Sequence, residues 1–298
     1  MNFKEGEVLY FNKPLGWTSF KVVGHARYHI CRRMGVKKLK VGHAGTLDPL
    51  ATGVMIVCTG RATKRIEEFQ YHTKEYIADI RLGATTPSYD LEHEIDATYP
   101  TEHITRELVE EVLQRFKGEI HQVPPAFSAC MVNGTRAYDL ARRGEEVDLK
   151  PKLLVIDEIE LLACNLPDIR VRVVCSKGTY IRALARDIGQ ALDSGAHLTA
   201  LCRTRVGDVR LEDCLDPRNF KVIQQFHEKM KEYPDYRVIG EPKITYHDGY
   251  TYNINFNATH YFGGYPNGYP SKENITVQII LDLETETYTF TTIKGDLY

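Results

Sequence analysis

Alternating and continuous apolar runs predict several strands in the first two thirds of the chain. Residues 76–82 and 169–175 alternate apolar and polar side chains at a period of two, as half-buried strands do. Residues 9–12, 54–58 and 154–156 are short apolar runs of strand length. The first two thirds of the chain are therefore expected to form a sheet.

Other segments show the apolar spacing of helices. Ser19 is placed to cap an amphipathic helix, residues 105–117 form a second, and residues 62–69 form a shorter one. Thr179 is placed to cap a helix over residues 180–192 that carries Arg182 and Arg186 about one turn apart. Strands interleaved with helices and hairpin-like runs predict a mixed α+β fold rather than a regular parallel repeat.

The composition changes near Tyr233. From there to Tyr298 the chain holds 10 of its 18 tyrosines, and residues 250–256, 276–283 and 287–293 alternate like strands. A last helix is expected over residues 219–231 and a linker over 232–241. The sequence thus predicts two domains, residues 1–232 and a small all-β module over residues 233–298.

Composition and charge restrict the class of protein. A content of 43% hydrophobic and 26% charged residues is ordinary for a soluble globular protein, and no apolar run approaches the ~20 residues of a membrane span. With no signal-like N-terminus, we expect a cytoplasmic protein with no membrane partner. Seven dispersed cysteines without CxxC pairs fit free structural thiols better than zinc sites or disulfides.

The net charge of −2 hides a strongly basic stretch. Residues 21–40 contain seven Lys and Arg residues and no acid, whereas residues 233–298 contain 4 basic and 8 acidic residues. A basic patch of this kind attracts phosphates locally, although a solvated helix face is the ordinary alternative.

The most unusual stretch surrounds Asp48. Gly42, Gly45 and Gly53 permit special backbone conformations, and Pro49 fixes the chain directly after the carboxylate. Asp48 could be a nucleophile, a metal ligand or a turn residue. The sequence has no HExxH or DxDxDG pattern to supply further metal ligands, and no GxxxxGK[ST] phosphate loop. A nucleophilic carboxylate needs a cationic partner, for which Arg182 is a candidate that sequence alone cannot place.

Motifs in order over about residues 7–216 make the chain resemble the TruB-type tRNA pseudouridine synthases. They lie at residues 13–19, 42–53, 60–64, 74–76, around 90, and at 123–129, 133–138, 175–182 and 195–204. The resemblance implies a mainly antiparallel pseudouridine-synthase sheet flanked by helices and loops. It also implies an enzyme that isomerises a uridine in the T loop of tRNA, at position 55, with no cofactor and no metal.

The resemblance also implies roles for individual residues. Asp48 would attack the flipped uridine at the ribose C1′, breaking the N-glycosidic bond so that uracil rotates and rejoins through C5. Arg182 would pair with Asp48, and Tyr76 would stack on the flipped base and relay the C5 proton. His43 would enter the RNA loop that the uridine vacates. Further matching positions line the uracil pocket or the active region: Tyr180, Leu201, Asp90 and Lys64.

Taken singly, each of these residues also has an ordinary explanation in a turn, a core or a helix surface. Lys13 is expected to support the loop that carries Asp48, and the basic stretch at residues 21–40 to follow RNA phosphates. The expected partner is the T arm of tRNA, bound by a monomer without guide RNA. Two alternatives are a catalytically silent RNA-binding protein and a guide-RNA-dependent synthase.

The chain departs from the family in two places. Met131 stands where the family often has a lysine, which puts any role of that lysine in doubt. The acidic residues 233–298 do not resemble the basic PUA-type domain that many members carry, so the purpose of this module is open.

Overall fold

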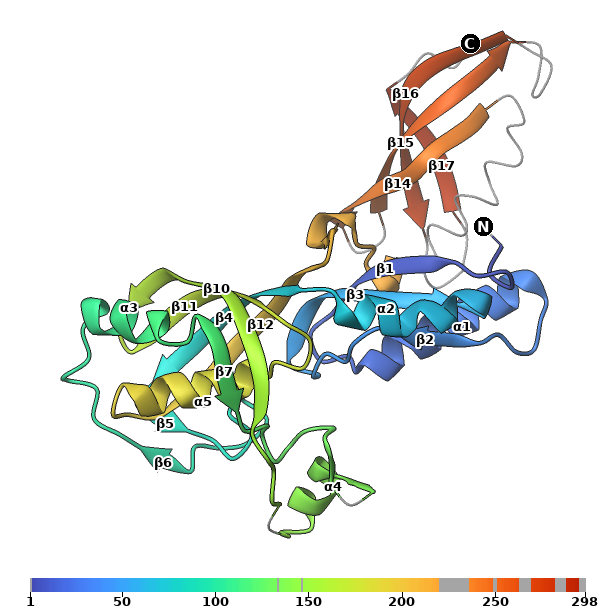
Figure 1. The fold of residues 1–298 in the computed structure, drawn as a ribbon. Helices are drawn as coiled ribbons and strands as arrows, with labels where there is room; N and C mark the ends of the chain where they lie inside the picture. The colour runs from blue at the N-terminus through green and yellow to red at the C-terminus, as the bar shows by residue number, and fades with distance from the viewer. Residues whose placement is uncertain are drawn as a thin grey trace. The chain divides into compact units, whose positions relative to one another are not determined.

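The computed structural model describes residues 2–132, 134–145, 147–219, 236–248, 251–262, 269–281 and 288–294. The chain divides into two compact units, Met1–Pro217 and Arg218–Tyr298, which we describe separately (Figure 1). The predicted domain boundary at residue 232 and nearly all of the predicted helix at residues 219–231 lie outside the described residues.

A large mixed sheet forms the centre of the N-terminal unit. Its strands run in the order β1 (Val8–Lys13), β3 (Ala51–Thr59), β12 (Ala196–Val206), β4 (Lys74–Leu82), β11 (Asp168–Cys175), β10 (Lys152–Asn165) and β7 (Gly118–Gln122). Two shorter strands extend it, since β2 (Val41–His43) pairs with β3 and β13 (Val209–Arg210) with β12. Only β3 and β12 pair in parallel among these described strands, so the predicted mixed, mainly antiparallel sheet is confirmed.

Alternation along β4 and β11 creates one apolar face. Val171 and Val173 of β11 are fully buried, whereas Arg170, which belongs to the polar set of the same alternation, is exposed. Two helices, α3 (Arg106–Gln114) and α5 (Ile181–Ala191), pack on this apolar face and share its core (Figure 1). The start of α5 is therefore fixed against the sheet, which matters because Arg182 lies there.

Two predicted helix caps are wrong. Thr18, not Ser19, caps α1 (Ser19–Met34), and its hydroxyl accepts a hydrogen bond from Lys21 N. Tyr180, not Thr179, is the N-cap of α5. Both predicted caps use their hydroxyls elsewhere, because Ser19 bonds to the loop that carries Asp48 and Thr179 donates to Ser176 O.

Several shorter elements lie between the strands of the sheet along the chain. The predicted helix at residues 62–69 is a 3₁₀ turn, η1 (Gly60–Arg65), followed by α2 (Ile66–Tyr71). The remaining elements of this unit are short: β5 (Ala84–Thr85), β6 (Ala97–Thr98), β8 (Met131–Val132), β9 (Thr135–Arg136), α4 (Ala137–Arg142) and η2 (Leu211–Asp213), with η3 (Pro217–Asn219) at its end.

The C-terminal unit contains one antiparallel sheet in chain order. Its strands are β14 (Tyr236–Asp248), β15 (Thr251–Phe262), β16 (Tyr269–Leu281) and β17 (Tyr288–Lys294). The prediction of a β-rich module agrees with these strands. The predicted linker at residues 232–241 is wrong from Tyr236 onward, because this residue already pairs with His260.

Candidate active site

Hydrogen bonds from two side chains, Ser19 and Lys13, hold the backbone on either side of Asp48. Ser19 accepts a hydrogen bond from Leu47 N at 2.9 Å and donates to Leu47 O at 3.0 Å. The buried Lys13 ammonium donates to Pro49 O at 3.3 Å and to Trp17 O at 2.6 Å. Burial lowers the pKa of Lys13 from 10.5 to about 8, partly offset by the charge of Asp48. Lys13 therefore supports this loop, as predicted.

Arg203 of β12 fixes the loop from the sheet side. It is 2% exposed and donates from Nε to Val54 O at 2.7 Å and from Nη2 to Gly45 O at 3.2 Å. Gly53 has a φ of +109°, and a Cβ there would lie 2.2 Å from Arg203 O. A glycine is thus required where β3 pairs with β12, because any side chain would collide with the neighbouring backbone.

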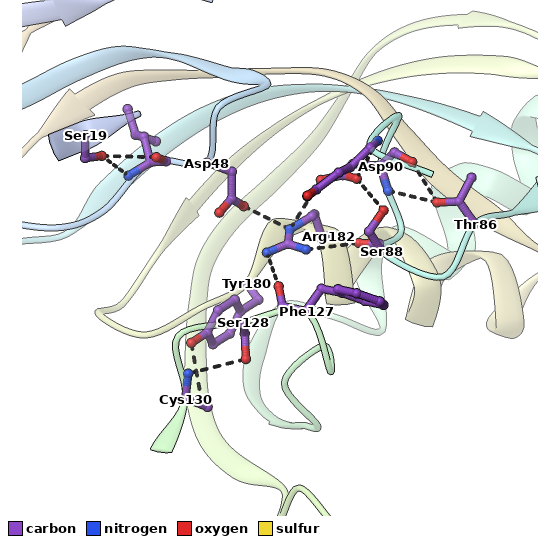
Figure 2. Close-up of polar contacts among 12 residues, drawn as sticks. Ser19, Asp48, Thr86, Ser88, Asp90, Phe127, Ser128, Cys130, Tyr180 and Arg182 are labelled. Atoms are coloured by element: carbon purple, nitrogen blue, oxygen red, sulfur yellow. Dashed lines mark hydrogen bonds and ion pairs between the residues drawn. The ribbon is translucent and has the colours of Figure 1, made fainter. Parts of the chain in front are cut away.

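Arg182 and Asp48 meet directly, with 2.9 Å between Nε and Oδ2. The other guanidinium nitrogens of Arg182 donate to Ser88 O at 3.1 Å and to Phe127 O at 2.9 Å (Figure 2). The Arg182 side chain is 6% exposed, whereas that of Asp48 is 41% exposed. The arginine is therefore immobilised inside the protein, and the carboxylate keeps an accessible side.

Asp90 is a second carboxylate beside the same arginine. Its Oδ2 lies 3.7 Å from Arg182 Nε, and its Oδ1 accepts hydrogen bonds from Ser88 Oγ at 2.6 Å and Glu92 N at 3.0 Å. Its side chain is only 7% exposed. These contacts place a second, largely buried carboxylate against Arg182, and the predicted contact of Asp90 with substrate stays a prediction.

A cavity of about 310 Å³ opens beside Asp48. Its walls include Tyr76, Tyr180, Leu201 and Arg182, which the sequence had grouped with Asp48, and also Arg203. Ligand sites have volumes of about 300–1,000 Å³, so this cavity suits a small ring. A second cavity of about 120 Å³ shares Asp48, Arg182 and Leu201 with it and also touches Asp90.

The two tyrosines of the larger cavity are neutral phenols. Burial raises the pKa of Tyr76, although the nearby Arg203 charge acts in the opposite direction. Burial likewise raises the pKa of Tyr180. Gln122 clamps the backbone of Tyr180, because its Oε1 accepts from Tyr180 N at 2.9 Å and its Nε2 donates to Tyr180 O at 3.2 Å. Gln122 is 1% exposed and was missed from sequence.

Two predicted residues lie apart from both cavities. His43 is in β2, half-buried, and its ring centroid is 6.2 Å from that of Phe20. Burial lowers the pKa of His43. Lys64 is exposed in η1. Neither lines the walls of the two cavities that contain Asp48, so their predicted contacts with RNA stay predictions.

All seven cysteines are free thiols in this structure. In the part of the chain that the structure describes, no cluster of three His, Cys, Asp or Glu residues could hold a metal ion. No helix among the described residues is long and apolar enough to cross a membrane.

Solved structures share this architecture. One is a chain from a Cbf5–Nop10–Gar1 complex, with a TM-score of 0.57 and 28% identity over 78% of this chain and 57% of that one. Another comes from an H/ACA RNP bound to a substrate RNA containing 2′-deoxyuridine, with a TM-score of 0.55 and 26% identity over 77% of this chain and 56% of that one. This chain thus spans less than two thirds of either protein.

Residues 32–181 match the model of the TruB family pseudouridylate synthases, N-terminal domain. This family match identifies the chain as a pseudouridine synthase. The tRNA pseudouridine synthase B of Bacteroides fragilis is 86% identical over 220 residues, 74% of this chain and 94% of that relative. The enzyme of the same name from Mycobacterium bovis is 47% identical over 209 residues, 69% of this chain and 68% of that relative. The chain belongs to the TruB family.

The match to the Bacteroides fragilis relative also shows what is unusual in this chain. The aligned segment covers 94% of the length of that relative but only 74% of the length of this chain. The unmatched remainder of the relative is too short to hold a four-stranded sheet like β14–β17. The match therefore leaves about a quarter of this chain without an aligned segment in that relative.

Proposed function

We propose that this chain converts the uridine at position 55, in the T loop of tRNA, to pseudouridine with Asp48 as the nucleophile. The observation that carries the proposal is the 2.9 Å contact between the accessible Asp48 carboxylate and the buried Arg182 at the wall of a ring-sized cavity. The relatives named tRNA pseudouridine synthase B support tRNA as the substrate.

The reaction begins when Asp48 attacks the ribose C1′ of a uridine flipped into the cavity. The C1′–Asp48 ester forms as the bond from C1′ to N1 breaks, and its electron pair leaves with the uracil ring. The ring then rotates, C5 forms a bond to C1′, and the Asp48 carboxylate is released. The proton lost from C5 ends on N1, so substrate and product have the same atoms and no co-reactant is consumed.

The cavity walls account for the remaining requirements. Tyr76 stacks on the flipped base, and stacking on an aromatic ring contributes ~1–3 kcal/mol, enough to hold a base outside its own stack. Its neutral hydroxyl relays the C5 proton. Tyr180 and Leu201 exclude water from the reacting ring, and Arg182 orients the Asp48 carboxylate.

RNA outside the cavity is bound by a basic surface. The seven Lys and Arg residues at positions 21–40 follow the phosphates, His43 enters the vacated loop, and Lys64 contacts the RNA nearby. We further propose that the protein works as a monomer in the cytoplasm without guide RNA. The tRNA-named relatives favour direct recognition over the guide-dependent arrangement of the H/ACA neighbours.

Pseudouridine formation in a T-arm stem-loop tests the proposal. The wild-type chain alone should convert one uridine per stem-loop, and Asp48→Asn should bind this RNA normally but form no product. Binding without product by the wild type would favour the silent RNA-binding alternative. Product formation that requires an added guide RNA would favour the guide-dependent alternative.

A further inference from the structure

Phe20 is a large apolar side chain in an unexpected place. It lies in the first turn of α1 and is 76% exposed. A single exposed apolar residue is ordinary on a protein surface. Phe20, however, contacts a residue of the proposed RNA-binding surface, because its ring meets that of His43 edge to face at an interplanar angle of 85°.

The position of Phe20 relative to Asp48 is fixed by the fold. Its neighbour Ser19 is held by two hydrogen bonds to Leu47, the residue directly before Asp48. Leu15, from the same segment, is 65% exposed and lines the smaller cavity together with Asp48. The N-terminal segment therefore presents two exposed apolar side chains from a support that is bonded to the reactive loop.

A basic residue directly follows Phe20 in the chain. Lys21 is the next residue, and its Nζ lies 4.5 Å from the centroid of the Trp17 ring. The acid-free stretch at residues 21–40 continues from there. An exposed aromatic ring beside positive charge is better suited to bind an unstacked RNA base and its phosphates than to bind an apolar surface of another protein.

We propose that Phe20 is a base-stacking residue for an unpaired nucleotide of the RNA loop next to the flipped uridine, supported at its edge by His43. This inference rests on the proposed function and names a further specificity determinant for it. Phe20 does not reach the reacting atoms. It acts on the affinity for the RNA loop.

The test compares Phe20→Ala, Phe20→Trp and the wild type with an unmodified T-arm stem-loop. Phe20→Ala should raise the Kd about 10-fold, which corresponds to ~1.4 kcal/mol, and leave the single-turnover rate at saturating RNA within about twofold. Phe20→Trp should restore the affinity. Leu162→Ala serves as the matched control, because Leu162 is a 44% exposed apolar residue of β10 that lines neither cavity with Asp48, and it should change nothing.

A set of stem-loops with one abasic loop nucleotide each identifies the stacked base. In one of them the wild type and Phe20→Ala should bind equally, because the partner of the ring is gone. Equal binding of all variants to the intact stem-loop, or an unchanged Kd ratio in every abasic stem-loop, would overturn the inference. The Phe20 inference is decided by the Kd values, which do not require turnover. A wild type that binds the stem-loop without turnover would therefore refute the proposed function, while the Kd values would still decide the inference about Phe20.

Discussion

Replacing Gln122 by Leu tests how the wall of the cavity is held. Gln122 is buried at the end of β7, and its side chain makes two hydrogen bonds to the backbone of Tyr180. In the variant, Tyr180 O keeps its hydrogen bond from Leu184 N at 3.0 Å. Tyr180 N loses the acceptor that the buried Gln122 side chain provides.

The magnitude follows from these two bonds. A buried N–H left without an acceptor costs about 1–3 kcal/mol, and the lost second bond adds about 0.5–1.5 kcal/mol. The free energy of unfolding should therefore fall by roughly 2–4 kcal/mol. For a unit of the size of Met1–Pro217, each kcal/mol lowers Tm by about 2–4 °C, so the expected decrease is roughly 4–16 °C.

Tryptophan fluorescence isolates this effect. Trp17 is the only tryptophan of the chain and lies in the N-terminal unit, so its signal follows the unfolding of that unit. Gln122→Glu is the control, because its carboxylate can still accept from Tyr180 N, and its Tm should lie between those of the wild type and Gln122→Leu. The loosened Tyr180 should also raise KM for the T-arm stem-loop in Gln122→Leu.

A Gln122→Leu variant that melts and reacts like the wild type would refute this reasoning. It would show that the backbone of Tyr180 finds other partners at no measurable cost.

Three further predictions concern the loop support, the sheet and the C-terminal unit. The free energy of unfolding of the N-terminal unit should rise between pH 8 and 9, because burial lowers the pKa of Lys13 and Lys74 from 10.5 to about 8, so the unfolded chain binds more protons there. Urea titrations read by Trp17 fluorescence check this rise, and Lys13→Met should reduce its slope. Above pH 9 the free energy of unfolding is lowered again by the buried Cys58 and Cys175 thiols, because burial raises their pKa from 9.0 to about 11. Gly53→Ala should destabilise the unit by roughly 3 kcal/mol or more, because the new Cβ collides with the backbone of Arg203, and a wild-type midpoint in urea would contradict this. Deleting residues 233–298 should leave pseudouridine formation within about threefold of the full chain, since all the residues placed in the proposed site lie in Met1–Pro217; complete loss in a folded, truncated protein would contradict it.

The sequence predicted the strands that alternate cleanly and missed β12, in which buried polar residues break the alternation. Tyr76 and Val171 belong to regular alternations and were placed in strands, as the structure has them. β12 was not predicted, because its buried His197 and Arg203 interrupt the apolar pattern. A buried polar side chain is indistinguishable from an exposed one until its partners in other elements are known.

The same limit applies to the site. Asp48 and Arg182 could be paired only through the resemblance to the TruB family, and the structure brings them together. Gln122 and Ser88 were not found, because each acts on another residue's backbone or carboxylate and neither lies in a pattern of its own. Ser19 was assigned the nearest local role, a helix cap, although its partner Leu47 is distant in sequence.

The second carboxylate beside Arg182 has a consequence for charge balance during the proposed reaction. In the free protein, Asp48 and Asp90 together carry one more negative charge than Arg182 compensates. Once Asp48 becomes a neutral ester, Arg182 and Asp90 remain as a balanced buried pair. The intermediate therefore never leaves the guanidinium without a counterion, and the excess negative charge of the site moves to the uracil ring and returns to Asp48 when C5 bonds to C1′.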